Sequence, residues 1–407
     1  MSTASFGVTR SPRLILFGHG QRFALGRTAV ALGRRALLCT DPRFGAAPEL
    51  GALVDNLREA GVEARVYDGT EAELPAAGIH ACVDAMRGFD PEVVVGVGGG
   101  SCMDMAKLVS LLLAHDGPLD RYYGELNVPG PVRPVIALPT TSGTGSEVTP
   151  VAVLADDARD LKVGVSTPYL IPHAAICDPD LTTSCPPRLT AYSAADALTH
   201  AIESFTAVRR EPTAALAGER VFVGKNALSD AYALSAIGAI ARWLPRALAD
   251  GADGQARAGL MLGALHAGLA FGAAGTAAAH AIQYPVGALT HTAHAVGVAQ
   301  LMPYVMAYNR PACTDEFAQI ARAMNVAGDD PERLADAAID AVAALLDGAG
   351  VPRTLAELGL PQDRIGWVAA QSMLAARLVT NNPRPLDERT MHAIVAAAFR
   401  GDRAWRG

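Results

Sequence analysis

The first half of the chain alternates short apolar runs with stretches of helical spacing. Apolar or alternating runs predict strands at residues 13–17, 35–40, 62–67, 92–97 and 135–138. Apolar positions three and four apart predict helices at residues 50–60, 75–87 and 104–115. The run at residues 92–97 is almost continuously apolar, as in strands buried on both faces of a parallel sheet. This alternation predicts an α/β domain with an open parallel sheet between helices.

Strand patterns stop at about Leu181, and helical patterns follow. They predict helices at residues 191–206, 228–248, 255–271, 276–284, 296–308, 315–324 and 331–349, with two or three more up to Arg400. Prolines and glycines separate these patterns, and Pro285 is expected to end the fourth helix. Residues 209–226 have no clean period and are predicted to be an excursion between two helices. A chain of 407 residues is too long to fold around a single hydrophobic core. We therefore expect an α/β domain over residues 1–185 and an all-α domain over residues 186–407.

The bulk composition narrows the class of protein. Half of the residues are hydrophobic and 18% are charged, which is typical of a well-buried enzyme, and the formal net charge of -7 argues against nucleic acid as a partner. The six cysteines are scattered without a C-x-x-C pair, which favours reduced thiols in the cytoplasm. No secretory signal is predicted at the N-terminus, and the Gly- and Ala-rich residues 259–281 are interpreted as buried helix rather than a membrane span.

A glycine-rich turn joins the strand at residues 92–97 to the next helix. Gly98, Gly99 and Gly100 are followed by Ser101, and Asp104 opens the predicted helix. Three adjacent glycines let the backbone approach an anion closely, and the N–H groups of the new helix then point at it. A tight turn alone rarely needs three glycines followed by serine. The turn therefore predicts phosphate binding, although it is neither G-x-G-x-x-G nor a P-loop.

A second loop rich in hydroxyl groups follows the strand at residues 135–138. Its candidate contacts to a nucleotide are Thr140, Thr141, Ser142, Thr144 and Ser146. Open α/β sheets bind ligands at the carboxyl ends of their strands, so nucleotide binding is favoured over a merely solvated loop. Asp41 ends the second strand, where a carboxylate binds a ribose diol and repels a 2′-phosphate. This favours NAD, with NADP as the alternative, while Asp-Pro is also a common turn.

Asp196 and His200 are the first candidate metal ligands. They lie four residues apart in a predicted helix and so share one face. Spacing alone favours an ordinary helix-surface pair. His280 lies in a later helical stretch, and His291 and His294 follow it three residues apart, so either of the last two could bind metal. One carboxylate and three imidazoles would make a four-ligand site for a transition metal.

Several motifs taken together resemble one known family. They are residues 98–101 with Asp104 and Lys107, residues 140–147, 171–179, 196–203, 267–271 and 280–294. In this content and order they resemble the iron-containing (group III) alcohol dehydrogenase family. The resemblance implies a dehydroquinate synthase-like architecture, with a Rossmann-like NAD-binding domain and a helical metal-binding domain. It also implies Asp196, His200, His280 and His294 as the metal ligands, and places Lys162 beside the nucleotide.

The resemblance further implies an NAD-linked, metal-dependent oxidoreductase acting on CH–OH, which interconverts a primary alcohol or hydroxyacid and its aldehyde or oxo form. The metal would act as a Lewis acid on the substrate oxygen. Fe(II) suits the ligand set, and Zn(II) is possible because it usually binds such sites more tightly. We expect a small-molecule alcohol or aldehyde as substrate, a cytoplasmic homodimer, and neither nucleic acid nor membrane as partner.

The sequence departs from the family pattern at three places. Tyr284 stands where many members have a second histidine, Ala295 replaces a usual glycine, and residues 208–228 are longer than in short members. Tyr284 and the longer segment resemble the hydroxyacid–oxoacid transhydrogenase branch, which retains its nicotinamide. Tyr284 or His291 is the predicted proton relay, and Arg384 could bind an acidic substrate or cap a helix. A non-redox lyase or synthase on the same scaffold is a third possibility.

Overall fold

The structure is a computed structural model that describes residues 6–156 and 161–405. Residues 1–5, where no secretory signal is predicted, lie outside the described part. The chain forms two compact units. Among the described residues, the α/β unit comprises residues 10–156, 161–185 and 218–221, and the helical unit comprises residues 6–9, 186–217 and 222–405.

The α/β unit is built on a six-stranded parallel sheet in the order β1-β9-β6-β4-β2-β3. Its strands are β1 (Leu14–Phe17), β2 (Arg35–Cys39), β3 (Glu63–Tyr67), β4 (Val93–Gly98), β6 (Val135–Pro139) and β9 (Ala174–Cys177). Every residue of β4 is buried, as predicted for a central strand. The expected parallel sheet is therefore confirmed.

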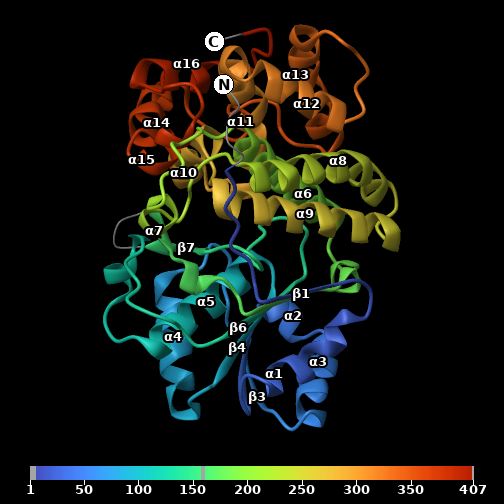
Figure 1. Cartoon of the computed structure of the whole chain (residues 1–407), viewed down its shortest axis with the longest axis vertical. Coiled ribbons are helices and arrows are strands. Elements are labelled where there is room, and N and C mark those ends of the chain that lie inside the picture. Colours follow the sequence, from blue (N-terminus) through green and yellow to red (C-terminus); the bar gives the residue numbers. More distant parts are fainter. Residues whose placement is uncertain (1–5, 157–160, 406–407) are drawn as a thin grey trace. The chain divides into compact units, whose positions relative to one another are not determined.

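Helices cover both faces of this sheet (Figure 1). They are α1 (Leu25–Val30), α2 (Pro42–Gly45), α3 (Pro48–Glu59), α4 (Ala76–Met86) and α5 (Gly100–Ala114). The side chains of β2 alternate between two cores, because successive residues of a strand point to opposite faces. Leu37 packs in the core that contains α4 and α5, while Leu38 packs with α1 and α3. The helix after the glycine turn begins at Gly100 rather than at the predicted Asp104.

A small second sheet in the same unit was missed by the sequence analysis, as was β9. Its strands are β5 (Gly124–Glu125), β7 (Val151–Asp156) and β8 (Leu161–Ser166), in the order β5-β8-β7. β7 and β8 pair antiparallel, from Val151 opposite Ser166 to Asp156 opposite Leu161. This hairpin follows the hydroxyl-rich loop directly.

The helical unit is organised around α6 (Pro187–Thr206), which is buried at nearly every position from Thr190 onward. α6 packs against α8 (Ala227–Ala249), α9 (Gly254–Ala274) and α11 (His294–Asn309) (Figure 1). The other helices are α7 (Leu216–Glu219), α10 (Ala278–Thr290), α12 (Thr314–Ala323), α13 (Pro331–Gly348), α14 (Ile365–Ser372), α15 (Ala376–Asn381) and α16 (Glu388–Arg400). The expectation of an all-α second half is confirmed.

The prediction that Pro285 ends a helix is wrong. α10 continues through Pro285 to Thr290, and Pro245 and Pro303 likewise lie inside α8 and α11. Within the described residues, no single helix is long and apolar enough to span a membrane. α9 and α10 together have the length and apolar composition of a membrane span, but the two helices are bent by 101° relative to each other and are mostly buried.

Candidate active site

α6 presents three chemically important side chains on one face. Asp196, His200 and Glu203 follow at intervals of four and three residues, so they lie one above another along the helix. All three are buried, with exposed fractions of 2%, 5% and 1%. The surface-pair interpretation of Asp196 and His200 is therefore wrong, because neither residue lies at the surface.

Histidines from two further helices meet this face. Asp196, His200, His280 and His294 each offer one ligand atom, and these four atoms all lie within 4.8 Å of one another. His280 lies in the first turn of α10, and His294 is the first residue of α11. The ring of His280 lies 4.9 Å from that of His200 and 5.2 Å from that of His294. His291 is exposed at the end of α10 and does not join the cluster.

The cluster fits a divalent transition metal. Oδ1 of Asp196 and Nε2 of His280 are buried without a hydrogen-bond partner, which costs free energy in a dry interior. They lie 4.0 Å apart, and Oδ1 of Asp196 lies 3.6 Å from Nε2 of His200. Two donors that each bind one ion at about 2.0–2.2 Å lie roughly 3–4 Å apart. An ion between these atoms would satisfy both unpartnered groups.

Glu203 fixes the orientation of His280. Its carboxylate accepts hydrogen bonds from the backbone N–H groups of Ala277 at 2.8 Å and Ala279 at 2.7 Å, and lies 2.6 Å from Nδ1 of His280. Burial alone would raise the pKa of Glu203, but His280 and these N–H groups together lower it. An ionised Glu203 can only accept, so Nδ1 carries the proton and Nε2 keeps its lone pair for a metal. No role was predicted for Glu203 from the sequence, although its spacing of seven residues from Asp196 places both side chains on the same face of a helix.

The role of Glu203 leads to a first prediction. The substitution Glu203→Gln keeps the shape of the side chain but removes its charge and one of its acceptor oxygens. We expect the affinity for Fe(II) or Zn(II) to fall by about 10- to 100-fold, as is usual when a carboxylate behind a metal-ligating histidine is lost. Titration with a competing chelator measures this. Unchanged affinity would contradict the orienting role.

The predicted phosphate-binding turn lies at the carboxyl end of β4. Gly98 ends the strand at φ 148°, Gly99 precedes α5, and Gly100 is its first residue. A Cβ at Gly98 would lie 2.5 Å from Sγ of Cys102, and one at Gly100 would lie 2.7 Å from Thr144. Side chains do not fit at these two positions. The turn thus brings bare backbone and the N-terminus of a long helix to the edge of the sheet.

The strands beside β4 bring the other predicted nucleotide contacts to the same edge. β2 and β6 pair with β4 on its two sides, so Asp41 and the loop from Thr140 to Ser146 flank the glycine turn. Asp41 caps α2 by accepting from the N–H of Phe44 at 2.9 Å. Three threonine hydroxyls in this region, at the ends of β2, β3 and β6, are buried without a hydrogen-bond partner: Thr40, Thr70 and Thr140. Such groups are expected where a polar ligand completes the site.

Some residues predicted to contact the nucleotide form hydrogen bonds or ion pairs within the protein. Asp104 accepts from the hydroxyl of Ser146 at 2.5 Å and from the N–H of Val153 at 2.9 Å, and so ties α5 to the hydroxyl-rich loop and to β7. Lys162 on β8 forms an ion pair with Glu73. Lys107 is buried and donates to the carbonyl of Val151 at 2.8 Å, and its burial lowers its pKa to about 8. Asp104 and Lys107 hold the loop and β7 in place, and the contact of Asp104 and Lys162 with a nucleotide stays a prediction.

The two candidates for the proton relay differ in position. Tyr284 lies one turn beyond His280 on α10, and its ring lies 6.5 Å from that of His294. Burial raises the pKa of Tyr284, so its hydroxyl stays protonated and can donate. His291 is exposed, in a left-handed conformation with φ 53°. The geometry favours Tyr284.

Comparison with known proteins agrees with a metal site in the helical unit and a nucleotide site in the α/β unit. A family model described as iron-containing alcohol dehydrogenase matches residues 12–179, and the model of its C-terminal region matches residues 190–399. The chain belongs to the iron-containing alcohol dehydrogenase family. It is 36% identical over 377 residues to long-chain-alcohol dehydrogenase 1 of Geobacillus thermodenitrificans (strain NG80-2), covering 90% of each chain.

Two further members of the family illustrate its range. The chain is 32% identical over 361 residues to the NAD-dependent methanol dehydrogenase of Bacillus methanolicus, covering 88% of this chain and 91% of that one. It matches the crystal structure of a 1,3-propanediol oxidoreductase with a TM-score of 0.90 and 31% identity, covering 97% and 100% of the two chains. The predicted family, fold class, alcohol dehydrogenase activity, and NAD and iron cofactors are confirmed.

Proposed function

We propose that this protein interconverts a small primary alcohol or hydroxyacid and its aldehyde or oxo form, with Asp196, His200, His280 and His294 holding Fe(II). The observation that carries the proposal is the convergence of these four donors, two of which have buried, unpartnered ligand atoms. When bound, the ion supplies a Lewis acid that makes the substrate hydroxyl easier to deprotonate, and NAD supplies the hydride acceptor.

The residues of the chain supply positioning and proton transfer. Glu203 holds Nε2 of His280 ready as a donor before any ion arrives. The glycine turn and the N-terminus of α5 would bind the phosphates of the nucleotide, and Asp41 would bind its ribose. The hydroxyl of Tyr284 would relay the substrate proton: its oxygen accepts that proton while its own O–H proton passes to water. The repulsion of a 2′-phosphate by Asp41 would make NAD preferred over NADP.

The relay leads to a second prediction. Tyr284→Phe is expected to lower kcat by about 10²-fold, because a positioned acid–base group contributes about that much or more. Steady-state kinetics with a primary alcohol measures the effect. His291→Ala is the matched control, since His291 is an exposed ionisable residue of the same helix region. If His291→Ala loses the activity and Tyr284→Phe keeps it, the assignment is reversed.

The proposed function is tested by a substrate screen. Protein restored with Fe(II) or Zn(II) under anaerobic conditions is mixed with NAD and a panel of primary alcohols and hydroxyacids, and NADH formation is followed by absorbance. We expect turnover that depends on the metal. Tightly bound NADH with little activity on added NAD would favour the transhydrogenase instead, and no activity in any assay would contradict both.

We also propose that the protein is a homodimer of the cytoplasm. The six cysteines are all buried and free, which suits a reducing compartment. Light scattering of the purified protein gives the oligomeric state, and a monomeric mass would contradict the dimer.

A further inference from the structure

We propose that Asn381 is a positioning residue of the metal site, which fixes the place of His280 through the backbone that joins α9 to α10. The inference rests on the proposed function, because it concerns the metal donors of that same site. Asn381 is the last residue of α15 and is buried, with 2% of its surface exposed. α15 packs against α10, the helix that carries His280 (Figure 1).

The side-chain amide of Asn381 completes the C-terminus of α9. The last four carbonyls of a helix have no partner within the helix itself. Nδ2 of Asn381 donates to the carbonyl of Ala274, the last residue of α9, at 3.0 Å and to the carbonyl of Thr276 at 3.1 Å. Both residues are buried, and a carbonyl can only accept. A side chain without a donor at position 381 would therefore leave two buried acceptors without this partner, which is costly.

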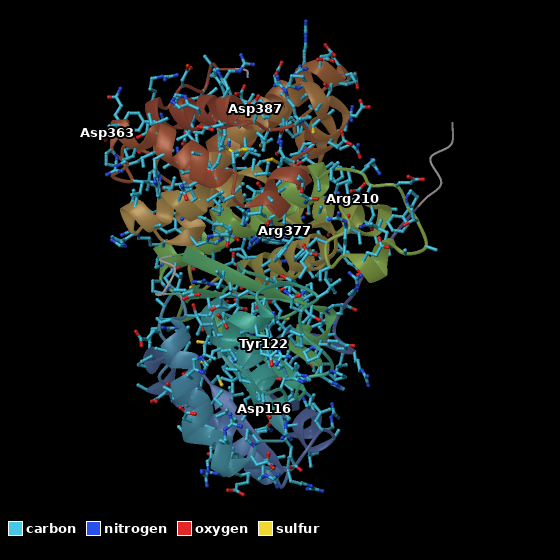
Figure 2. The ribbon with its side chains drawn as sticks, turned by 90° about the vertical axis from the view of Figure 1, so that its left-hand side faces the viewer. Asp116, Tyr122, Arg210, Asp363, Arg377 and Asp387 are labelled. Carbon is cyan, nitrogen blue, oxygen red and sulfur yellow. The ribbon has the colours of Figure 1, made fainter. Side chains whose placement is uncertain are left out.

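The bend between α9 and α10, residues 275–277, is packed closely between two other segments. Gly275 has φ 81°, and a Cβ there would lie 3.1 Å from Nδ2 of Asn381 and 3.1 Å from Cβ of Phe222. Arg377, which Figure 2 labels, lies one turn before Asn381 on α15, with its guanidinium carbon 4.4 Å from the centroid of the Phe222 ring. This stacking ties α15 to the excursion between α6 and α8. The bend thus has little room to move while α15 stays in place.

One peptide group joins Asn381 to Glu203. The carbonyl of Thr276 and the N–H of Ala277 belong to the same planar peptide unit. Asn381 donates to that carbonyl, and Oε2 of Glu203 accepts from that N–H at 2.8 Å. The same Oε2 lies 2.6 Å from Nδ1 of His280. Because the peptide unit is rigid, a rotation that releases the amide of Asn381 also turns the N–H away from Glu203, and the support of His280 weakens.

The backbone of Asn381 also binds the chain just beyond α6. Its carbonyl accepts from the N–H of Val208 at 2.9 Å, two residues after the end of that helix. α6 carries Asp196 and His200, whereas α10 carries His280. Asn381 therefore connects the segments that follow one donor helix and precede the other. Donors held in this way need little ordering when an ion binds, which favours a high affinity.

The first test measures metal affinity by titration with a competing chelator, for Fe(II) and Zn(II). We expect Asn381→Ala to lower the affinity by about 10-fold, the lower end of the loss usual for residues behind a ligand. Asn381→Asp keeps the size of the side chain, but an ionised carboxylate has no donor, so it should show a similar loss. Wild-type affinity in Asn381→Asp would overturn the inference.

The matched control is Asn382→Ala. Asn382 is the neighbouring buried asparagine, but its amide pairs with that of Asn309 and donates to the carbonyl of Arg384 instead of the bend. It should change the metal affinity by less than about 3-fold. Equal losses in Asn381→Ala and Asn382→Ala would show a general structural effect and overturn the inference.

A double-mutant cycle tests whether Asn381 acts through Glu203. Asn381→Ala is combined with Glu203→Gln, and the metal affinity of the double variant is compared with those of the two single variants. Residues of one hydrogen-bond network give non-additive effects. We expect the combined loss to be smaller than the product of the single losses by about 3-fold or more. Losses that simply multiply would contradict a route through Glu203.

Hydrogen exchange in the metal-free protein tests the same contacts without any ion. The N–H groups of Ala277 and Ala279 are bound to Glu203, so their exchange reports the order of the bend and of the first turn of α10. We expect Asn381→Ala to speed this exchange by about 10-fold and Asn382→Ala to leave it unchanged. Unchanged exchange in Asn381→Ala would overturn the inference. A wild type that binds neither Fe(II) nor Zn(II) would instead count against the proposed function.

Discussion

His280→Ala is expected to remove the bound metal and lower kcat by roughly 10³-fold or more, while NAD binding persists. A Lewis acid contributes several kcal/mol of transition-state stabilisation, and each 1.4 kcal/mol is about a factor of ten in rate. The substitution removes one donor and also leaves Glu203, which is 1% exposed, without its imidazole partner. Metal analysis, NAD titration and steady-state kinetics together measure the three effects.

The control for this variant is His392→Ala, because His392 is an exposed histidine of the same unit. It should keep its metal and its rate. A His280→Ala protein that retains both would show that the donor cluster is not the metal site. Circular dichroism distinguishes loss of metal from loss of fold.

Gly98→Val is expected to give the opposite pattern, with weaker NAD binding and unchanged metal content. Gly98 has φ 148°, which a side chain rarely adopts, and its Cβ would lie 2.5 Å from Sγ of Cys102 and 2.7 Å from Cβ of Cys102. Such strain costs about 1–3 kcal/mol, so KM for NAD should rise by about 10- to 100-fold. The turn must shift to accept valine, and the N–H groups of α5 then move away from the phosphates.

The control for this second variant is Gly51→Ala on α3. A Cβ at Gly51 meets nothing within 4 Å, and its φ is not in the left-handed region. Gly51→Ala should leave KM for NAD unchanged. An equal rise in both variants would indicate general destabilisation of the α/β unit, and no rise in Gly98→Val would show that this turn does not bind the nucleotide.

Periodicity predicted the parallel sheet well because its strands are short, apolar and separated by helical patterns. The buried run of β4 and the glycine turn after it are local features that a sequence displays directly. The hairpin of β7 and β8 was missed although β7 alternates between half-buried and buried positions.

The donor cluster could be predicted only in part. Spacing identified Asp196 and His200 as neighbours but suggested a surface pair, since burial of a helix face depends on helices that pack on it from distant parts of the chain. His294 could not be distinguished from His291 by spacing. In the structure, His291 follows the end of α10 with a left-handed backbone, and His294 begins α11 and joins the cluster. That choice came from the family resemblance.

The carboxylate of Glu203 has two structural roles, at the N-terminus of a helix and behind a metal ligand. Glu203 satisfies N–H groups at the N-terminus of α10 and holds His280, so the donors are in place as soon as the helical unit folds. Little binding free energy is then spent on ordering them, and a set of three imidazoles and one carboxylate can hold either Fe(II) or Zn(II), with Zn(II) usually bound more tightly. The metal bound by the enzyme would therefore depend on which ion the cell supplies. Cells rich in iron would yield an iron enzyme. Growth in excess zinc would replace the iron with zinc without a change of fold.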